Sequence, residues 1–183
     1  MRHKMIVSPF FTAALLIAAL VSTGQKTQAA PAEDSREVTQ LLEDVMSQVS
    51  DLQRDSDELE TFTRSNLSWQ SHADELTRIG DRINTLGKTL EKLERMRSSA
   101  SPWQREAMDR IVPLATKLAS NTTAAIEHLN KNPTHLSDPQ YQQYLKSNAE
   151  VARNLSSLVK DFVEYGKTKT TLESLESRLE VNK

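Results

Sequence analysis

The sequence predicts an all-α protein: an up-down-up-down antiparallel four-helix bundle with coiled-coil-like packing and a C-terminal helix that overhangs the bundle. Past residue 33, apolar residues recur at alternating spacings of three and four, the pattern of amphipathic helices packed along one stripe. Aromatic residues make up only 5% of the 183 residues, and only four are Gly. This composition excludes a strand-rich fold with many turns.

The first element, residues 1–32, is predicted to be a secretory signal peptide. Arg2 and Lys4 form a basic start, and a largely apolar stretch follows over residues 10–21. Cleavage is expected after Ala29 or Ala32. A membrane anchor is the alternative, but a membrane span needs roughly 20 apolar residues. We therefore expect an exported protein, periplasmic or extracellular, with no integral membrane segment after signal cleavage.

The net charge limits the class of partner, and the cysteine content limits the chemistry that the chain can perform. Signal cleavage removes three of the 23 Lys and Arg residues and none of the 25 Asp and Glu residues, leaving 20 against 25 and a net charge of −5. A mildly acidic surface of mixed sign disfavours nucleic acid as a partner. The chain has no Cys, which excludes disulfides, thiolate-bound metals and a thiol nucleophile.

The four-helix bundle is expected to span residues 33–166, and its first two helices each show one apolar stripe. The first stripe is Val38, Leu42, Val45, Val49, Leu52, Ser56, Leu59 and Thr63. The second is His72, Leu76, Ile79, Ile83, Leu86, Leu90, Leu93 and Arg97. A turn is expected near residues 66–68, because one helix running through that point would be about 96 Å long.

The third and fourth helices each have a chemically marked start. In Ser101-Pro102-Trp103-Gln104, Ser is an N-cap, Pro occupies the first helical position and Gln completes a capping box. Ser137-Asp138-Pro139-Gln140 repeats the pattern. The third stripe is Ala107, Ile111, Leu114, Leu118, Asn121, Ala125 and His128, and the fourth is Tyr141, Leu145, Asn148, Ala152, Leu155, Val159 and Phe162. Short loops between long helices predict antiparallel neighbours.

The antiparallel register places all three His residues of the mature chain at one end of the bundle. His72 and His128 lie at core positions of helices two and three, at matching distances from the intervening loop, so we expect them to face each other. His135 lies at the same end, with the aromatic residues Trp69, Tyr141 and Tyr144. His72, His128 and His135 are therefore candidate ligands for a divalent metal of the zinc or copper class. The alternative is a polar, aromatic bundle end that binds no cofactor, and we predict no other cofactor.

Residues 167–183 are predicted to form a helical tail. Gly166 is followed by a Thr- and Lys-rich stretch, after which Leu172, Leu175 and Leu179 form a new apolar stripe. Exposed apolar stripes usually mark an interaction surface. Together with Trp69, Tyr141 and Tyr144, these three Leu residues are the candidate interaction residues, for an unknown protein partner or a homo-oligomer. A frayed end, or a tail folded back at Gly166, is the alternative.

No catalytic residue is predicted, because the sequence lacks a phosphate-binding Gly-rich loop, a His-Glu-x-x-His helix and a Gly-x-Ser-x-Gly nucleophile elbow. The segments at residues 68–73, 100–104 and 161–167 resemble uncharacterised secreted bacterial helical-bundle proteins. That resemblance implies export and carries no activity. We therefore expect a non-enzymatic protein that acts through protein–protein interaction or self-assembly, with a metal or small-ligand site at the His72/His128 end as the alternative.

Overall fold

The computed structural model describes residues 33–65 and 67–179, and the described residues fold into four long α-helices and one short 3-10 turn. The predicted signal peptide at 1–32 lies outside the described residues. The helices are α1 (Arg36–Phe62), α2 (Trp69–Arg95), α3 (Pro102–Lys131) and α4 (Pro139–Leu179), with the 3-10 turn η1 (Arg97–Ser99) between α2 and α3. No strand occurs in this part of the chain. The all-helical class is confirmed.

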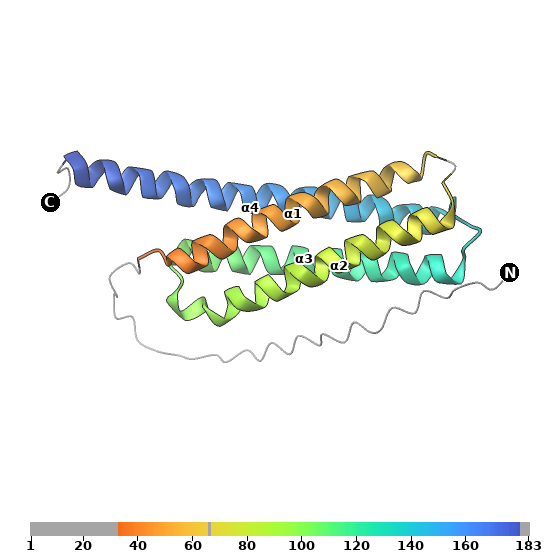
Figure 1. Cartoon of the computed structure of the whole chain (residues 1–183), viewed down its shortest axis with the longest axis horizontal. Coiled ribbons are helices and arrows are strands. Elements are labelled where there is room, and N and C mark those ends of the chain that lie inside the picture. The colour runs from red at the N-terminus through yellow and green to blue at the C-terminus, as the bar shows by residue number, and fades with distance from the viewer. Residues whose placement is uncertain (1–32, 66, 180–183) are drawn as a thin grey trace.

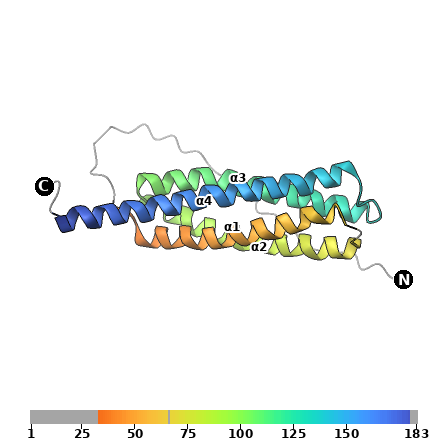
Figure 2. The same ribbon diagram turned by 90° about the horizontal axis from the view of Figure 1, so that it is seen from above.

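The four helices pack against one another along their lengths. Helix α1 contacts α2 and α4, and α3 contacts the same two neighbours. Two views at right angles show the helices alongside one another, with the C-terminal part of α4 extending beyond the ends of the other three (Figure 1 and Figure 2). Helix α4 has 41 residues, whereas α1 and α2 have 27 each. Among the described residues, no helix is long and apolar enough to cross a membrane.

The core consists of the predicted stripes, with some additions. Most stripe positions are buried, because each side chain at a spacing of three or four lies on the face shared with neighbouring helices. Thr63 lies just past the end of α1, and Leu114 is only partly buried. In α4 the buried residue is Val163 rather than Phe162, whose ring is partly exposed and lies 5.4 Å from the guanidinium of Arg110.

Buried polar side chains form a layer between α3 and α4. Asn148 is fully buried, and its amide donates to the Thr122 hydroxyl at 3.0 Å. Asn121, which is partly buried, donates to the Ser147 hydroxyl at 2.7 Å. The two Asn residues of the predicted stripes therefore lie in the same layer, and each has a hydroxyl partner on the facing helix. Pairs of this kind favour one register, because a shifted register leaves buried polar groups unpaired.

The start of α3 is tied to the start of α1 by one side chain. The fully buried Gln104 accepts hydrogen bonds from the backbone N–H groups of Ser101, at 2.9 Å, and Ser35, at 3.2 Å. Its amide donates to the Ser35 carbonyl at 2.9 Å and to the Thr39 hydroxyl at 3.0 Å. A residue expected only to cap its own helix therefore also satisfies backbone groups at the N-terminus of α1.

Candidate functional site

The aromatic end of the bundle is a packed cluster in which Tyr141 lies between two His residues. His72 is buried in α2, and its Nδ1 lies 2.9 Å from the hydroxyl oxygen of Tyr141 at the start of α4. The ring of His128, from α3, stacks on Tyr141 with centroids 5.7 Å apart. Phe62 packs edge-on to His72, and Tyr144 packs edge-on to His128. The two His residues therefore reach the same cluster, as the register predicts, but contact it through Tyr141.

Burial is the main influence on ionisation in this cluster. It lowers the pKa of His72, because a buried imidazolium loses its hydration, and it raises the pKa of the Tyr141 hydroxyl for the same reason. Both groups are therefore neutral at pH 7. A neutral imidazole and a neutral phenol can share one hydrogen bond without a counter-ion.

The third His residue does not join this cluster. His135 is exposed in the loop before α4, and its Nδ1 lies 3.2 Å from the Thr134 hydroxyl. The Nε2 of His128 lies 3.7 Å from a carboxylate oxygen of Asp138. Within residues 33–65 and 67–179, no group of three His, Cys, Asp or Glu side chains is placed to hold a metal ion. The metal hypothesis stays a prediction, and this geometry supplies no argument for it.

Trp69, the other predicted interaction residue at this end, is the first residue of α2. Its side chain is partly buried against the core, and that of Tyr144 is partly buried as well. Since Tyr141 is fully buried, most of the aromatic area at this end is already covered by the protein itself. The aromatic end therefore offers little surface to another protein.

The C-terminal part of α4 is the opposite case, because its apolar side chains are uncovered. Leu172, Leu175 and Leu179 are 55%, 38% and 65% exposed, and Tyr165 is 53% exposed. These are four of the five large apolar side chains that are exposed among the described residues. The fifth, Leu67, lies in the turn between α1 and α2. Exposed apolar area is thus concentrated on one helix.

These residues form a single row, which we call the α4 stripe: Tyr165, Thr168, Leu172, Leu175 and Leu179. Their spacings of three, four, three and four residues are those of a coiled-coil seam. A shallow, open hollow of about 360 Å³ lies beside the middle of the row and is lined by Lys167, Thr168, Thr171, Leu172 and Leu175. Tyr165 and Thr168 are not among the predicted interaction residues, although their spacing from Leu172 places them in the same row.

The α4 stripe lies on the opposite side of the helix from the core. Each residue turns an α-helix by about 100°, so the row through the buried residues Val159, Val163 and Gly166 continues as Thr170, Glu173 and Ser177. That continuation is polar and exposed. The α4 stripe is rotated by roughly half a turn from it. The apolar face of α4 therefore changes sides at Gly166 and points away from the bundle.

A group of polar contacts anchors α4 where this change occurs. Asp34 accepts a hydrogen bond from the indole N–H of Trp103 at 2.7 Å and one from the Lys169 ammonium at 2.8 Å. Burial alone would raise the pKa of Asp34, but the hydrogen bonds and the positive charge of Lys169 outweigh it and lower this pKa. The same hydrogen bond from Lys169 to Asp34 raises the pKa of Lys169. The base of the extension is therefore held by a charged pair.

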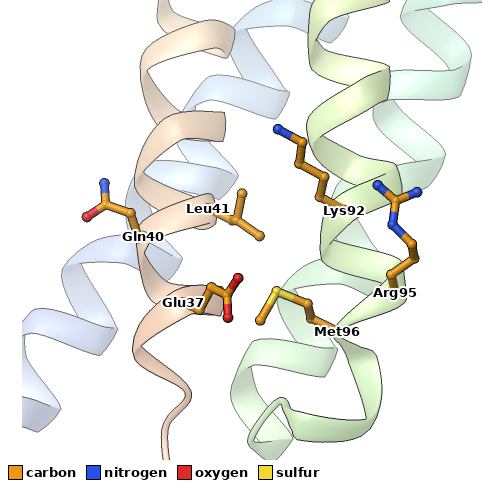
Figure 3. A pocket seen from close by; sticks show the side chains of 6 residues that line it. All are labelled: Glu37, Gln40, Leu41, Lys92, Arg95 and Met96. Carbon is orange, nitrogen blue, oxygen red and sulfur yellow. The ribbon is translucent and has the colours of Figure 1, made fainter.

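A second hollow lies between α1 and α2 at the end where α4 extends (Figure 3). It is an open groove of about 450 Å³, lined by Glu37, Gln40 and Leu41 from α1 and by Lys92, Arg95 and Met96 from α2. Leu41 and Met96 point toward the gap between the helices (Figure 3). No buried polar side chain lines it, so nothing in its walls selects a particular ligand.

Comparison of the chain with protein-family models, curated proteins and solved structures found no match.

Proposed function

We propose that this protein is an exported, non-enzymatic helical bundle that acts by protein–protein interaction, with the C-terminal part of α4 as its docking helix. One observation carries the proposal: in the α4 stripe, four of the five side chains are large, apolar and exposed, and the row faces away from its own bundle. Helices that lay an apolar row against another protein use this spacing of three and four residues. The sequence pattern of residues 1–32 supports export to the periplasm or the extracellular space.

The aromatic end is buried and the α4 stripe is exposed, which favours the α4 stripe as the docking surface. Tyr141 and His72 are fully enclosed, so a partner at that end would have to displace packed side chains. Leu172 and Leu179 already meet solvent over more than half of their surface. A partner that covered them would remove apolar area from water without first opening the fold, which makes association favourable.

We also infer that the four helices run up-down-up-down with antiparallel neighbours. Short connections support this topology, since only residues 63–68 separate α1 from α2 and residues 132–138 separate α3 from α4. Cross-helix pairs support it too. Asp34, at the N-terminus of α1, pairs with Lys169 late in α4, whereas Asp57 and Glu60, late in α1, pair with Arg153 earlier in α4.

The docking proposal is tested with immobilised full-length mature protein and two charge variants. Leu175→Glu places a charge in the α4 stripe, whereas Ser174→Glu places the same charge next to it and off the row. The baits are exposed to an extract of exported proteins supplemented with the purified chain itself. We expect the wild type and Ser174→Glu to retain the same protein, and Leu175→Glu to lose it.

Circular dichroism should show that all three baits keep the same helix content, because both substituted positions are exposed. Equal retention by Leu175→Glu and the wild type would show that the stripe is not the docking surface. An absence of any retained protein on the wild-type bait, including the added chain, would overturn the proposal as a whole.

A further inference from the structure

We propose that Asp34, just before α1, controls whether the α4 stripe is presented, because it holds the part of α4 that leads into the stripe in a helical conformation. That part is the junction, residues 166–171, which joins the bundle-bound length of α4 to the three Leu residues of the stripe, Leu172, Leu175 and Leu179. The inference rests on the docking function proposed above and identifies a regulation of the same site. It applies to any partner that docks on the stripe.

The sequence of the junction is a poor helix former. It reads Gly-Lys-Thr-Lys-Thr-Thr, so four of its six residues are Gly or Thr. Gly is the least favourable residue in a helix interior after Pro, and the β-branched Thr loses side-chain freedom there. The hydroxyls of Thr170 and Thr171 each donate to the backbone carbonyl four residues earlier, at 3.0 and 2.9 Å, a contact that slightly destabilises helices. Local preference therefore favours an end of the helix in the junction, yet α4 continues to Leu179.

Charged contacts with residues outside α4 hold the junction in place. Lys169 donates to the Asp34 carboxylate at 2.8 Å. The Lys169 side chain is 31% exposed and that of Asp34 is 17% exposed, so solvent screens this pair less than a surface pair. Asp34 is fixed in turn by the indole N–H of Trp103, from α3, at 2.7 Å. Lys167 pairs with Glu43 of α1 at 3.2 Å, but these side chains are 59% and 33% exposed. Asp34 therefore provides the less screened of these two ion pairs.

Lys169 is the last residue of α4 whose side chain bonds to the rest of the bundle. Within residues 33–65 and 67–179, no side-chain hydrogen bond or ion pair joins residues 170–179 to a residue outside α4. These residues are exposed, apart from the partly buried Glu176. A helix this short is marginal in water on its own, so residues 170–179 depend on helix that propagates from the last anchored position. Asp34 supplies that anchor from 135 positions earlier in the chain.

Loss of the anchor removes the stripe as a surface. Leu172, Leu175 and Leu179 share one side of α4 only while the residues between them are helical. If the junction unwinds, a partner has to order the segment as it binds, which weakens association. Cleavage at either expected position, after Ala29 or Ala32, leaves Asp34 in the chain. Trimming past Asp34 removes the anchor, so the start of the folded chain decides whether the docking helix is ordered.

Neutralising Asp34 in the full-length mature protein tests the anchor. Asp34→Asn keeps an oxygen that can accept from Trp103 and removes the charge that holds Lys169. Asp57→Asn is the matched control, because it neutralises a carboxylate that pairs with Arg153 of α4 at 2.8 Å within the bundle. The measurement is amide hydrogen exchange at residues 172–179. We expect protection there to fall about tenfold in Asp34→Asn and to keep its wild-type level in Asp57→Asn.

Rescue by helix propensity tests why the anchor is needed. Thr170→Ala combined with Thr171→Ala replaces two poor helix formers in the junction and leaves the α4 stripe and the charged residues unchanged. Added to Asp34→Asn, this pair of substitutions should restore most of the lost protection at residues 172–179. A failure to restore it would show that Asp34 does not act by holding a weak helix, and would overturn the inference.

Capture of the docking partner, measured on the same baits as Leu175→Glu, separates this inference from the docking function. Capture should weaken in Asp34→Asn and recover when the two Ala substitutions are added. Equal protection of residues 172–179 in Asp34→Asn and Asp57→Asn overturns the inference and leaves the docking function standing. Lost protection with undiminished capture also overturns it, because the anchor then does not control docking. A wild-type bait that retains no protein overturns the docking function, and the control of docking with it.

Discussion

The indole ring of Trp103 occupies the space that a side chain at Gly166 would need. A Cβ atom at Gly166 would lie 2.7 Å from the Cη2 atom and 3.0 Å from the Cζ2 atom of that ring. Trp103 also packs edge-on to Tyr165 and donates its N–H to Asp34. The indole therefore fixes the distance between α3 and α4 at the point where the apolar face of α4 changes sides.

Gly166→Ala should destabilise the protein by about 1–3 kcal/mol, because the added methyl group collides with a ring that is held on its far side. Gly80→Ala and Gly87→Ala are matched controls, since a Cβ at either position meets no atom within 4 Å. These two should stabilise the protein by up to about 1 kcal/mol, through the higher helix propensity of Ala. Urea unfolding followed by circular dichroism measures all three. A Gly166→Ala protein as stable as the two controls would contradict the close approach.

Gln104→Leu should cost about 3 kcal/mol or more, because it leaves the backbone N–H groups of Ser35 and Ser101 without an acceptor. Gln104→Glu should cost less. Its carboxylate still accepts from both N–H groups but cannot donate to the Ser35 carbonyl, which receives the Gln104 amide in the wild type. The free energy of unfolding should therefore decrease in the order wild type, Gln104→Glu, Gln104→Leu. Hydrogen exchange at the first turn of α1 is the second readout, and Gln104→Leu should raise it. Equal stabilities for the Glu and Leu variants would contradict the proposed sharing of this side chain.

The sequence predicts the buried rows well, because side chains at spacings of three and four share a face whatever their neighbours are. Val45 and Leu155 are examples, and both are fully buried. The buried acids Asp55 and Glu75 are not predicted, because each lies beside a stripe rather than on it. A helix that contacts two neighbours buries a wider band than one row, and the width of that band depends on the packing of all four helices.

The candidate sites, like the core, can be predicted only in part from the sequence. The register predicts that His72 and His128 approach each other, but only the rotation of α4 decides that Tyr141 lies between them. The α4 stripe is local and can be read from its spacing. That it faces away from the bundle follows from where the core row ends, at Gly166, and the position of that end depends on the lengths of the other three helices.

Arg82→Met should destabilise the protein by about 1–3 kcal/mol, because Asp55 is only 2% exposed and Arg82 donates to it from α2. Arg54 and Arg78 remain near Asp55 and limit the loss. The double variant Asp55→Leu with Arg82→Met should lose less than Arg82→Met alone, because no buried carboxylate is then left with weakened pairing. Thermal and urea unfolding give both values. The single variant Asp55→Leu completes the cycle. A double variant whose loss of stability equals the sum of the losses in Asp55→Leu and Arg82→Met would show that the two side chains are not coupled.

The stability of the protein should fall as the pH is lowered through the region where His72 takes up a proton in the unfolded chain. Burial lowers the pKa of His72 in the folded protein below its ordinary value of 6.5. Below pH 6.5 the unfolded chain therefore binds a proton that the folded protein does not, and the free energy of unfolding decreases. The decrease ends once the pH lies below the folded pKa, where both states are protonated.

Substitution at His72 isolates this contribution. His72→Gln removes the titrating group and retains an amide that can hydrogen-bond the Tyr141 hydroxyl, so its free energy of unfolding should change less between pH 7 and pH 5 than that of the wild type. His128→Gln removes the other imidazole that packs on Tyr141, and His135→Gln removes the exposed one. Urea unfolding of the four proteins at several pH values measures the slopes. A wild-type slope in His72→Gln, compared with the slopes of the other two variants, would show that His72 is not the group that couples folding to pH.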